Sequence, residues 1–219
     1  MKMKPAPDVC RHLSLASVGG FFASYSVLVT GHMAIAQTSN LMEMVHSALE
    51  QHWHMAAMAL GCLLVYAAGL SLPILLRRFS RLKPELLSPL ISAAACVSVI
   101  FTAHAPFPLG LYPLFFAASV QWNTFSGAQG FNSSTTFSTN NTRQTVIGLI
   151  DYLCTSDKEH LKRFRLFGAT LLCFYTGAAI AFFAVQLWNI RGILVNLVLI
   201  VVSLAMILRE QKLKKSKIS

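Results

Sequence analysis

The stretch LLSPLISAAACVSVIFTAHAPFPLGLYPLFFAASVQWNTFSGAQGFNSSTTFSTNNT, residues 86–142, decides the class of fold because it contains no Asp, Glu, Lys or Arg. A soluble domain places charged side chains on the outward face of its helices and strands, and this stretch has none to place there. Charged residues make up only 12% of the whole chain, against about 25% in soluble domains, and hydrophobic residues make up 55%. The solvent that suits such a chain is lipid, so we expect an integral membrane protein.

Six apolar runs follow one another along the chain, and each is long enough to cross about 30 Å of hydrocarbon as a helix that rises about 1.5 Å per residue. They cover residues 13–35, 53–76, 86–103, 109–131, 166–189 and 192–208. Asn189-Ile190-Arg191 separates the last two runs, and a pair of prolines separates the third from the fourth. The sequence therefore predicts an all-α membrane protein with six transmembrane helices, in a single membrane domain over residues 1–219.

Lys and Arg alternate between the connections of these runs. They cluster in the N-terminal segment, in the second connection (residues 77–83), in the fourth (residues 143–165) and in the tail (residues 209–217). The first and third connections have none, and the fifth has only Arg191. Since cytoplasmic loops carry the excess of Lys and Arg, both termini and the even-numbered connections are predicted to be cytoplasmic, in a multi-pass protein of a bacterial cytoplasmic membrane.

The formal charge of +10 is carried by these clusters beside the apolar runs, and no basic groove interleaved with aromatic residues accompanies them. Membrane lipids with anionic headgroups are therefore the expected partners, and a nucleic acid is not. The five cysteines are scattered without a C-x-x-C pair, so the sequence predicts neither a disulfide framework nor a zinc site.

Two connections carry a similar polar sequence after the first helix of a three-helix half. Thr38-Ser39-Asn40 follows the first run and Thr139-Asn140-Asn141 follows the fourth, and each leads into a helix-like stretch. Aligning Asn40 with Asn141 also places like residues opposite one another downstream. Three spans is an odd number, so a second half of this kind is inserted upside down relative to the first. We therefore expect two inverted repeats, residues 1–105 and 106–208, followed by a basic cytoplasmic tail over residues 209–219.

At these positions the chain resembles the YoaK family, a group of bacterial membrane proteins known as a domain of unknown function. The resemblance rests on Gly19-Gly20-Phe21-Phe22 with Tyr25, Ala36-Gln37-Thr38-Ser39-Asn40, Gln121-Trp122-Asn123 and residues 133–144. The family usually has Thr-Gly-Asn at both tripeptides, whereas Ser39 and Asn140 stand at the glycine positions here. The resemblance implies the fold and brings no established activity.

The polar residues near the two tripeptides are the candidate binding site for an unknown small polar solute. They are Gln37, Thr38, Asn40, Gln121, Asn123, Thr139, Asn140, Asn141 and Arg143. Their interpretation has an alternative, since the same uncharged groups can cap interrupted helices or hydrogen-bond between helices. Arg143 has one too, because it can attract an anionic group or anchor the chain at the cytoplasmic surface. If the site exists, we expect Asn40 and Asn141 to face one shared polar cavity.

A metal site is the less favoured interpretation of the segment before the second run. On a continued helix, His46, Glu50 and His54 lie four residues apart and share one face. His and Trp are also ordinary residues of the membrane interface, so we assign no metal and no cofactor. The segment Ser126-Gly127-Ala128-Gln129-Gly130 lacks the spacing of a hydrolase elbow and is interpreted as a glycine-rich packing surface.

Three classes of function remain open. A small transporter or permease-like protein for a polar solute is the leading prediction, and it requires no enzyme activity. The second class is a non-transporting membrane protein, such as a sensor, a lipid-binding scaffold or a partner subunit, and association into a homo-oligomer is left open. The third is an intramembrane metal-dependent enzyme built on the histidine segment.

Overall fold

The computed structural model describes residues 6–31, 36–102, 104–106 and 108–216, and these residues form helices joined by short connections and one long loop. The elements are α1 (Pro7–Thr30), α2 (Gln37–Leu49), α3 (Trp53–Phe79), α4 (Pro84–Thr102), the 3-10 turn η1 (Leu109–Leu111), α5 (Tyr112–Thr124), α6 (Thr139–Thr155), α7 (Lys158–Trp188), the 3-10 turn η2 (Asn189–Val195) and α8 (Asn196–Lys215). The predicted all-α class is therefore confirmed.

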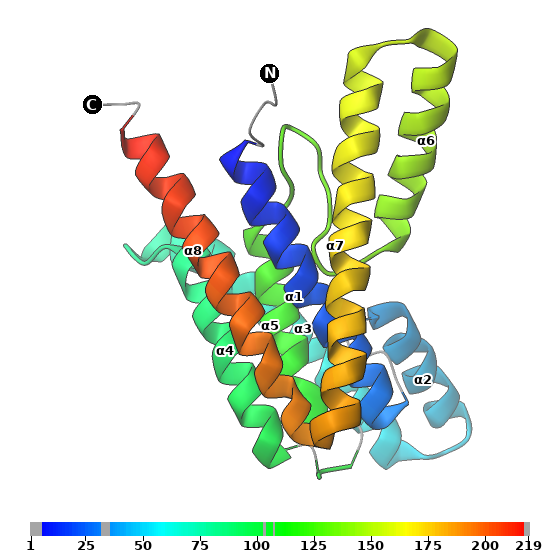
Figure 1. Ribbon diagram of the computed structural model, residues 1–219. Coiled ribbons are helices and arrows are strands. Elements are labelled where there is room, and N and C mark those ends of the chain that lie inside the picture. Colours follow the sequence, from blue (N-terminus) through cyan, green and yellow to red (C-terminus); the bar gives the residue numbers. More distant parts are fainter. Residues whose placement is uncertain (1–5, 32–35, 103, 107, 217–219) are drawn as a thin grey trace.

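Four helical stretches in the described residues are long and apolar enough to cross a membrane. They are α1, α3, α4 and the stretch Lys158–Lys215, in which η2 reverses the direction of the chain between α7 and α8 (Figure 1). The chain is thus a membrane-type helical protein. The count of six spans stays a prediction, because η1 and α5 together cover only Leu109–Thr124, fewer than the roughly 20 residues that a span needs.

Several predicted boundaries are wrong, each for a physical reason. The fourth run was expected to continue to Phe131, but its helix ends at Thr124, because Gly127 and Gly130 adopt positive φ angles that a helix does not contain. α7 begins well before its apolar run, where the Asp157 carboxylate caps it by accepting a hydrogen bond from the backbone N–H of Glu159. α7 thus extends beyond its apolar run, whereas α5 is shorter than its run.

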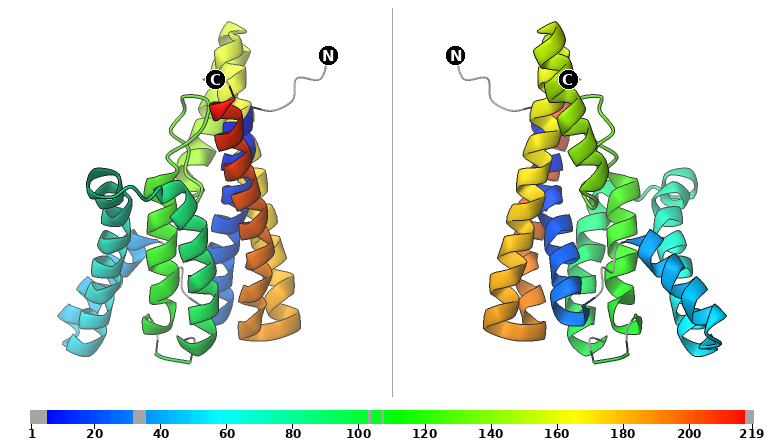
Figure 2. Two further views of the ribbon diagram at one scale, coloured as in Figure 1. Left: turned by 90° about the vertical axis from the view of Figure 1, so that its left-hand side faces the viewer. Right: turned by 90° about the vertical axis from the view of Figure 1, so that its right-hand side faces the viewer.

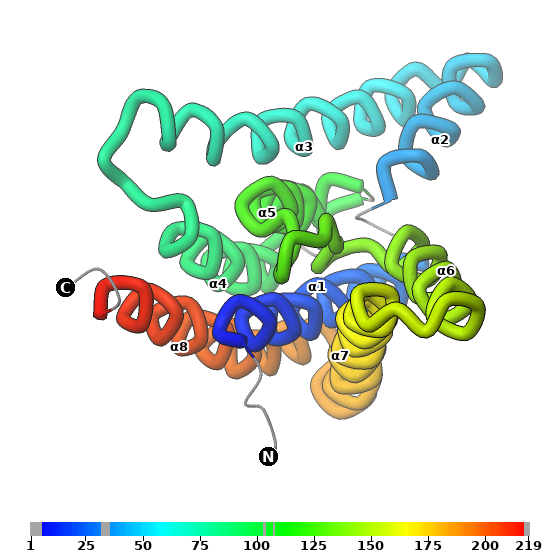
Figure 3. Tube along the Cα trace, turned by 90° about the horizontal axis from the view of Figure 1, so that it is seen from above, coloured from blue at the N-terminus to red at the C-terminus, as the bar shows by residue number. Residues whose placement is uncertain are grey.

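The first four α-helices and the last four have corresponding neighbours. α1 packs on α7 and α8, and α5 packs on α3 and α4. The short helix α2 packs on α3 as α6 packs on α7, while α4 and α8 pack on each other (Figure 3). Exchanging α1 to α4 for α5 to α8 therefore leaves these principal packing pairs unchanged.

The connections fall at two ends of the bundle. Figure 1 shows both termini and the α6–α7 connection at one end, with the α3–α4 connection at the same end of its two helices. The α2–α3, α4–η1 and α7–α8 connections lie at the other end, as the side views of Figure 2 also show. Among the described residues, the Lys and Arg side chains of the α3–α4 connection, of the start of α7 and of the end of α8 belong to the first end, and Arg191 belongs to the second.

The core lies where α1 meets α4, α5, α7 and α8, and α1 supplies its largest buried side chains, including Phe21, Phe22 and Tyr25. α1 and α7 approach at backbone distance, because Gly20 lies against the carbonyl group of Phe174 and Gly177 against that of Ser17. Small residues permit such contacts between membrane helices. Large apolar side chains, such as those of α7 and α8, remain exposed around the outside of the bundle, as a surface facing lipid requires.

Candidate functional site

A cavity of about 770 Å³ lies at the meeting point of the two groups of helices. Its walls come from α1, α3, α5 and α7, together with the segment that begins α2 and the segment that leads into α6. The lining residues are Gly20, Ala23, Ser24, Val27, Leu28, Ala36, Gln37, Thr38, Tyr66, Trp122, Thr136, Phe137, Ser138, Thr139, Phe174, Tyr175 and Ala178. This volume is in the range of small-molecule sites in proteins.

The two tripeptides meet this cavity through their threonines. Thr38 lies in the first turn of α2 and Thr139 is the first residue of α6, and both line the cavity. Asn40 and Asn141 are buried behind them and are not among its lining residues. As expected from the sequence, each tripeptide stands at the start of a helix, and the N-cap residues Ala36 and Ser138 make no side-chain capping hydrogen bond.

Gln37 brings an unusual polar group to the cavity wall. Its side-chain amide oxygen and nitrogen are both buried, and neither has a hydrogen-bond partner among the residues that the structure describes. A buried amide normally makes up to four hydrogen bonds, and a buried polar group left without one costs about 1–3 kcal/mol. Gln37 therefore has hydrogen-bonding capacity left for a ligand.

Asn141 holds together the loop that connects α5 to α6. Its amide nitrogen donates hydrogen bonds to the carbonyl oxygens of Ser134 (2.7 Å) and Phe137 (3.1 Å). Its amide oxygen accepts from the Ser134 N–H (3.2 Å) and from the Ser133 hydroxyl (3.1 Å). The side chain is fully buried, and three of these four bonds satisfy backbone groups of a non-helical segment inside the bundle.

His12 of α1 extends this network, and the network assigns its tautomer. Its Nε2 lies 2.9 Å from the Ser133 Oγ, and the single hydroxyl hydrogen of Ser133 is donated to Asn141. The Ser133 oxygen must therefore accept from His12, so Nε2 carries the hydrogen and Nδ1 carries a lone pair. The Nδ1 atom is buried and has no partner among the described residues. Nothing in the sequence pattern singled out this histidine.

Gln121 and Asn123 connect helices to their neighbours. The Gln121 amide nitrogen donates to the carbonyl oxygen of Leu15 and to the hydroxyl of Thr135, both at 3.0 Å, and joins α5 to α1 and to the α5–α6 loop. The Asn123 amide donates to the carbonyl oxygen of Leu70 and joins α5 to α3. Both side chains thus make the interhelical contacts that were the alternative to ligand binding.

Asn140 and Arg143 lie on the exposed face of α6, away from the cavity lining. The Asn140 side-chain oxygen accepts a hydrogen bond of 3.4 Å from Gln144 one turn later. Gln144 in turn accepts from the guanidinium of Arg163 on α7, which fixes the α6–α7 pair. The structure therefore brings Gln37, Thr38 and Thr139 together and leaves the other candidates outside the cavity.

Aromatic side chains form much of the cavity wall, and they were not among the site residues predicted from the sequence. The Trp122 ring lies 5.2 Å from that of Phe137 and 6.2 Å from that of Tyr66, measured between ring centroids. Phe174 and Tyr175 contribute rings from α7. In the sequence, the position of Trp122 between the polar residues Gln121 and Asn123 is the feature that could have indicated a role in the site.

The premise of the metal hypothesis is wrong. His46 lies in α2 and His54 in α3, while Glu50 lies between them, where α2 has ended. Gln51 adopts a left-handed conformation with φ of 61°, so no continued helix places the three side chains on one face. Within the described residues, no three His, Cys, Asp or Glu side chains gather as metal ligands.

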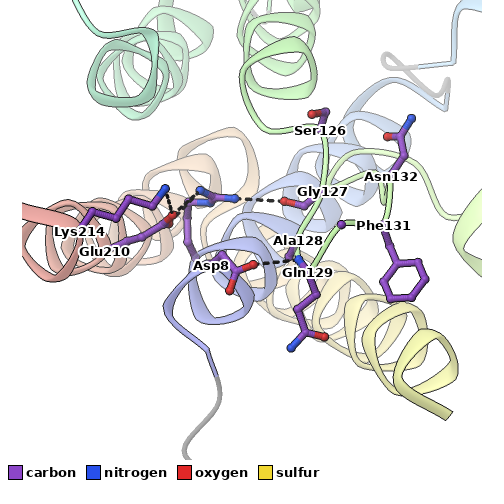
Figure 4. Close-up of a pocket in the computed structure, with 11 residues that line it drawn as sticks. Asp8, Ser126, Gly127, Ala128, Gln129, Phe131, Asn132, Glu210 and Lys214 are labelled. Atoms are coloured by element: carbon purple, nitrogen blue, oxygen red, sulfur yellow. Dashed lines mark hydrogen bonds and ion pairs between the residues drawn. The ribbon is translucent and has the colours of Figure 1, made fainter. Parts of the chain in front are cut away.

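A second cavity, of about 520 Å³, lies at the end of the bundle where the termini are (Figure 4). Glu210 of α8 accepts ion pairs from Arg11 (2.8 Å) and Lys214 (2.7 Å). Arg11 also donates to the carbonyl oxygen of Gly127, and Asp8 accepts from the backbone N–H of Gln129. The segment over residues 126–130 is thus a loop fastened to α1, and its Ala128 belongs to a buried cluster with Val9 and Leu166.

Comparison with known proteins places this geometry in a family. No curated protein and no solved structure matches the chain. The model of a family described as "Protein of unknown function (DUF1275)" matches residues 12–207, which include both tripeptides and every helix that lines the larger cavity. The match covers well over half of the chain, and the chain therefore belongs to the DUF1275 family of proteins of unknown function.

Proposed function

We propose that the chain is a small permease-like carrier for a polar solute in a bacterial cytoplasmic membrane, with both termini in the cytoplasm. The observation that carries this proposal is the cavity of about 770 Å³ to which the two tripeptides contribute Thr38 and Thr139. A carrier needs a solute-sized site between two parts that move relative to each other, and it needs no catalytic residue.

Two inverted halves supply such parts in the proposal. The corresponding packing pairs of α1 to α4 and α5 to α8 support them. So does the placement of the short helices, since the α2–α3 and α6–α7 connections lie at opposite ends of the bundle (Figure 1). Transporters built from inverted repeats bind their solute at the interface of the halves, next to interrupted helices.

The loop between α5 and α6 supports the same interpretation. Ser133, Ser134, Thr135 and Thr136 are all buried although they belong to no helix. Non-helical backbone at the depth of membrane helices is tolerated where protein buries it or where it lines a cavity. Thr136 to Thr139 continue this segment along the cavity wall, so the interruption and the cavity are adjacent.

The orientation rests on charge. Among the described residues, Lys and Arg gather at the α3–α4 connection, the start of α7 and the end of α8, whereas the other end of the bundle has only Arg191. The positive-inside rule then assigns the clustered end to the cytoplasm. The resemblance to bacterial YoaK proteins is consistent with membership of the DUF1275 family and supports the choice of membrane.

Cysteine accessibility tests the proposal even though the solute is unidentified. The five native cysteines are replaced, and Thr38→Cys and Thr139→Cys are introduced one at a time into the full chain. A membrane-impermeant thiol reagent is applied to the outside of intact cells and, separately, to inverted vesicles, whose outer face is the cytoplasmic one. We expect both cysteines to react from both sides, because a carrier opens its site to each side in turn.

Ser203→Cys on α8 is the matched negative control, since this position is buried away from the cavity and is expected to stay unreactive. Reaction of Thr38→Cys and Thr139→Cys from one side alone indicates a receptor or sensor pocket. If neither cysteine reacts from either side of the membrane, the result indicates a closed scaffold. Either result contradicts transport.

A further inference from the structure

The cavity that the proposed carrier would use has a distinctive lining. Among the described residues that line it, none is Asp, Glu, Lys, Arg or His. A formally charged solute therefore finds no opposite charge on these walls, and removing it from water is costly without such a partner. This lining favours a solute without net charge.

The aromatic residues of the lining indicate which kind of uncharged solute the cavity favours. Rings of Tyr66, Trp122 and Phe137 form one connected aromatic wall, and Phe174 and Tyr175 form another on α7. Aromatic faces bind planar groups in stacked or edge-to-face arrangements.

Gln37 supplies hydrogen-bonding groups for the solute. Its amide offers a donor and an acceptor side by side, both buried and both without a partner in the described part of the chain. A ligand that carries an acceptor beside a donor, as a carboxamide or a cyclic lactam does, pairs with both atoms at once. The unpaired amide raises the free energy of the empty protein. If the Gln37 side chain turns toward the cavity, a ligand of this kind pairs with the amide and removes that free-energy penalty as it binds.

We infer that the cavity binds a small, neutral, planar solute whose edge presents an amide-like donor and acceptor, which pairs with Gln37 while its ring lies against the aromatic wall. This inference rests on the proposed function only in taking the cavity as the binding site. It concerns which solute binds, and it can be tested in the purified protein without any measurement of transport.

The test uses the fluorescence of Trp122 as a reporter of the cavity. The chain has three tryptophans, and Trp53→Phe with Trp188→Phe leaves Trp122 alone in the full-length protein. Three probes share one ring and differ at its edge: benzamide, the benzoate anion and toluene. We expect saturable quenching by benzamide, with at least about tenfold weaker binding of benzoate and toluene, since one hydrogen-bonded edge is worth about this factor.

Two substitutions separate the site from general effects. Gln37→Leu is expected to weaken benzamide binding about tenfold and to leave toluene binding unchanged. Gln186→Leu makes the same change at an exposed position of α7 and is expected to leave both unchanged. A protein that retains only Trp188 reports partition of the probes into detergent and should show no saturable quenching.

Equal affinity for benzamide and toluene, tighter binding of benzoate, or benzamide binding that survives Gln37→Leu would overturn the inference. These outcomes are distinct from failure of the transport proposal. Selective benzamide binding with cysteines that react from one side only contradicts transport and upholds the ligand class. Cysteines that react from both sides without benzamide selectivity contradict the ligand class and uphold transport.

Discussion

At the scale of single residues, the polar side chains around the two tripeptides divide into those that line the cavity and those that bind protein oxygens. Gln37, Thr38 and Thr139 were predicted as site residues, and they line the cavity. Gln121 was predicted on the same grounds, but both of its amide hydrogens go to protein oxygens. One of these acceptors is Leu15, far away in the sequence, and the partner of a buried amide depends on such distant contacts. Residue type and spacing do not contain that information.

Asn141 and its neighbour Asn140 give a matched pair of substitutions. Asn141→Ala removes the hydrogen-bond partner of the Ser134 N–H, of the Ser134 and Phe137 carbonyl oxygens and of the Ser133 hydroxyl hydrogen in a buried site. Since each such group costs about 1–3 kcal/mol, we expect the free energy of unfolding to fall by about 3 kcal/mol or more. Asn140→Ala changes an exposed side chain and should alter it by less than about 0.5 kcal/mol.

Thermal unfolding of the detergent-solubilised variants measures the difference. Asn141→Asp is a further check, because a carboxylate cannot donate to the two carbonyl oxygens that the amide nitrogen now contacts. Equal melting temperatures for the Asn140 and Asn141 variants would show that the loop does not depend on this side chain.

At the scale of elements, hydropathy predicted the existence of the helices and misjudged several of their ends. The apolar runs located α1, α3, α4, α7 and α8 because lipid-facing helices must be apolar over their membrane-spanning length. The end of α5 at Thr124 could not be read from hydropathy, since the following residues are also uncharged. What ends α5 is backbone geometry at Gly127 and Gly130, together with hydrogen bonds that stabilise an irregular loop.

Contact between α1 and α7 depends on glycine at one position and not at another. A Cβ atom at Gly20 would lie 1.8 Å from the carbonyl oxygen of Phe174, so Gly20→Ala forces the two helices apart. We expect a loss of about 1–3 kcal/mol, as for other overpacked cores. Gly168→Ala on α7 meets its nearest neighbour at 3.7 Å and should stabilise by up to about 1 kcal/mol through helix propensity.

Melting temperatures of the two glycine variants, measured in the same detergent, give the comparison. Opposite shifts are the expected result. A Gly20→Ala variant as stable as the natural chain would mean that α1 and α7 are not in backbone contact in solution.

At the scale of the whole molecule, charge distinguishes the two ends of the bundle, and the packing pairs of α1 to α4 correspond to those of α5 to α8. The distribution of Lys and Arg depends on the sequence alone, whereas the packing pairs of α1 to α4 and α5 to α8 emerge only in the folded bundle. The two are independent physically, because one concerns insertion into the membrane and the other concerns side-chain fit. The sequence predicts an inverted repeat from two short tripeptides. Three residues in each proposed half do not indicate which helices pack on one another.

The proposed orientation and the proposed inverted repeat both depend on the membrane topology, which reporter fusions can test. We expect green fluorescent protein fused to the C-terminus, or inserted into the α6–α7 connection at Ser156, to fluoresce, since it folds in the cytoplasm. Alkaline phosphatase at these two positions should be inactive, because it requires export for activity. Inserted into the α4–η1 connection beside Pro106, the phosphatase should be active, since that connection lies at the opposite end of the bundle, where Lys and Arg are scarce. Active phosphatase at the C-terminus would show that the orientation is the opposite of the proposed one. Activity at both ends would mean that the bundle does not insert in one defined orientation, which contradicts the proposed topology.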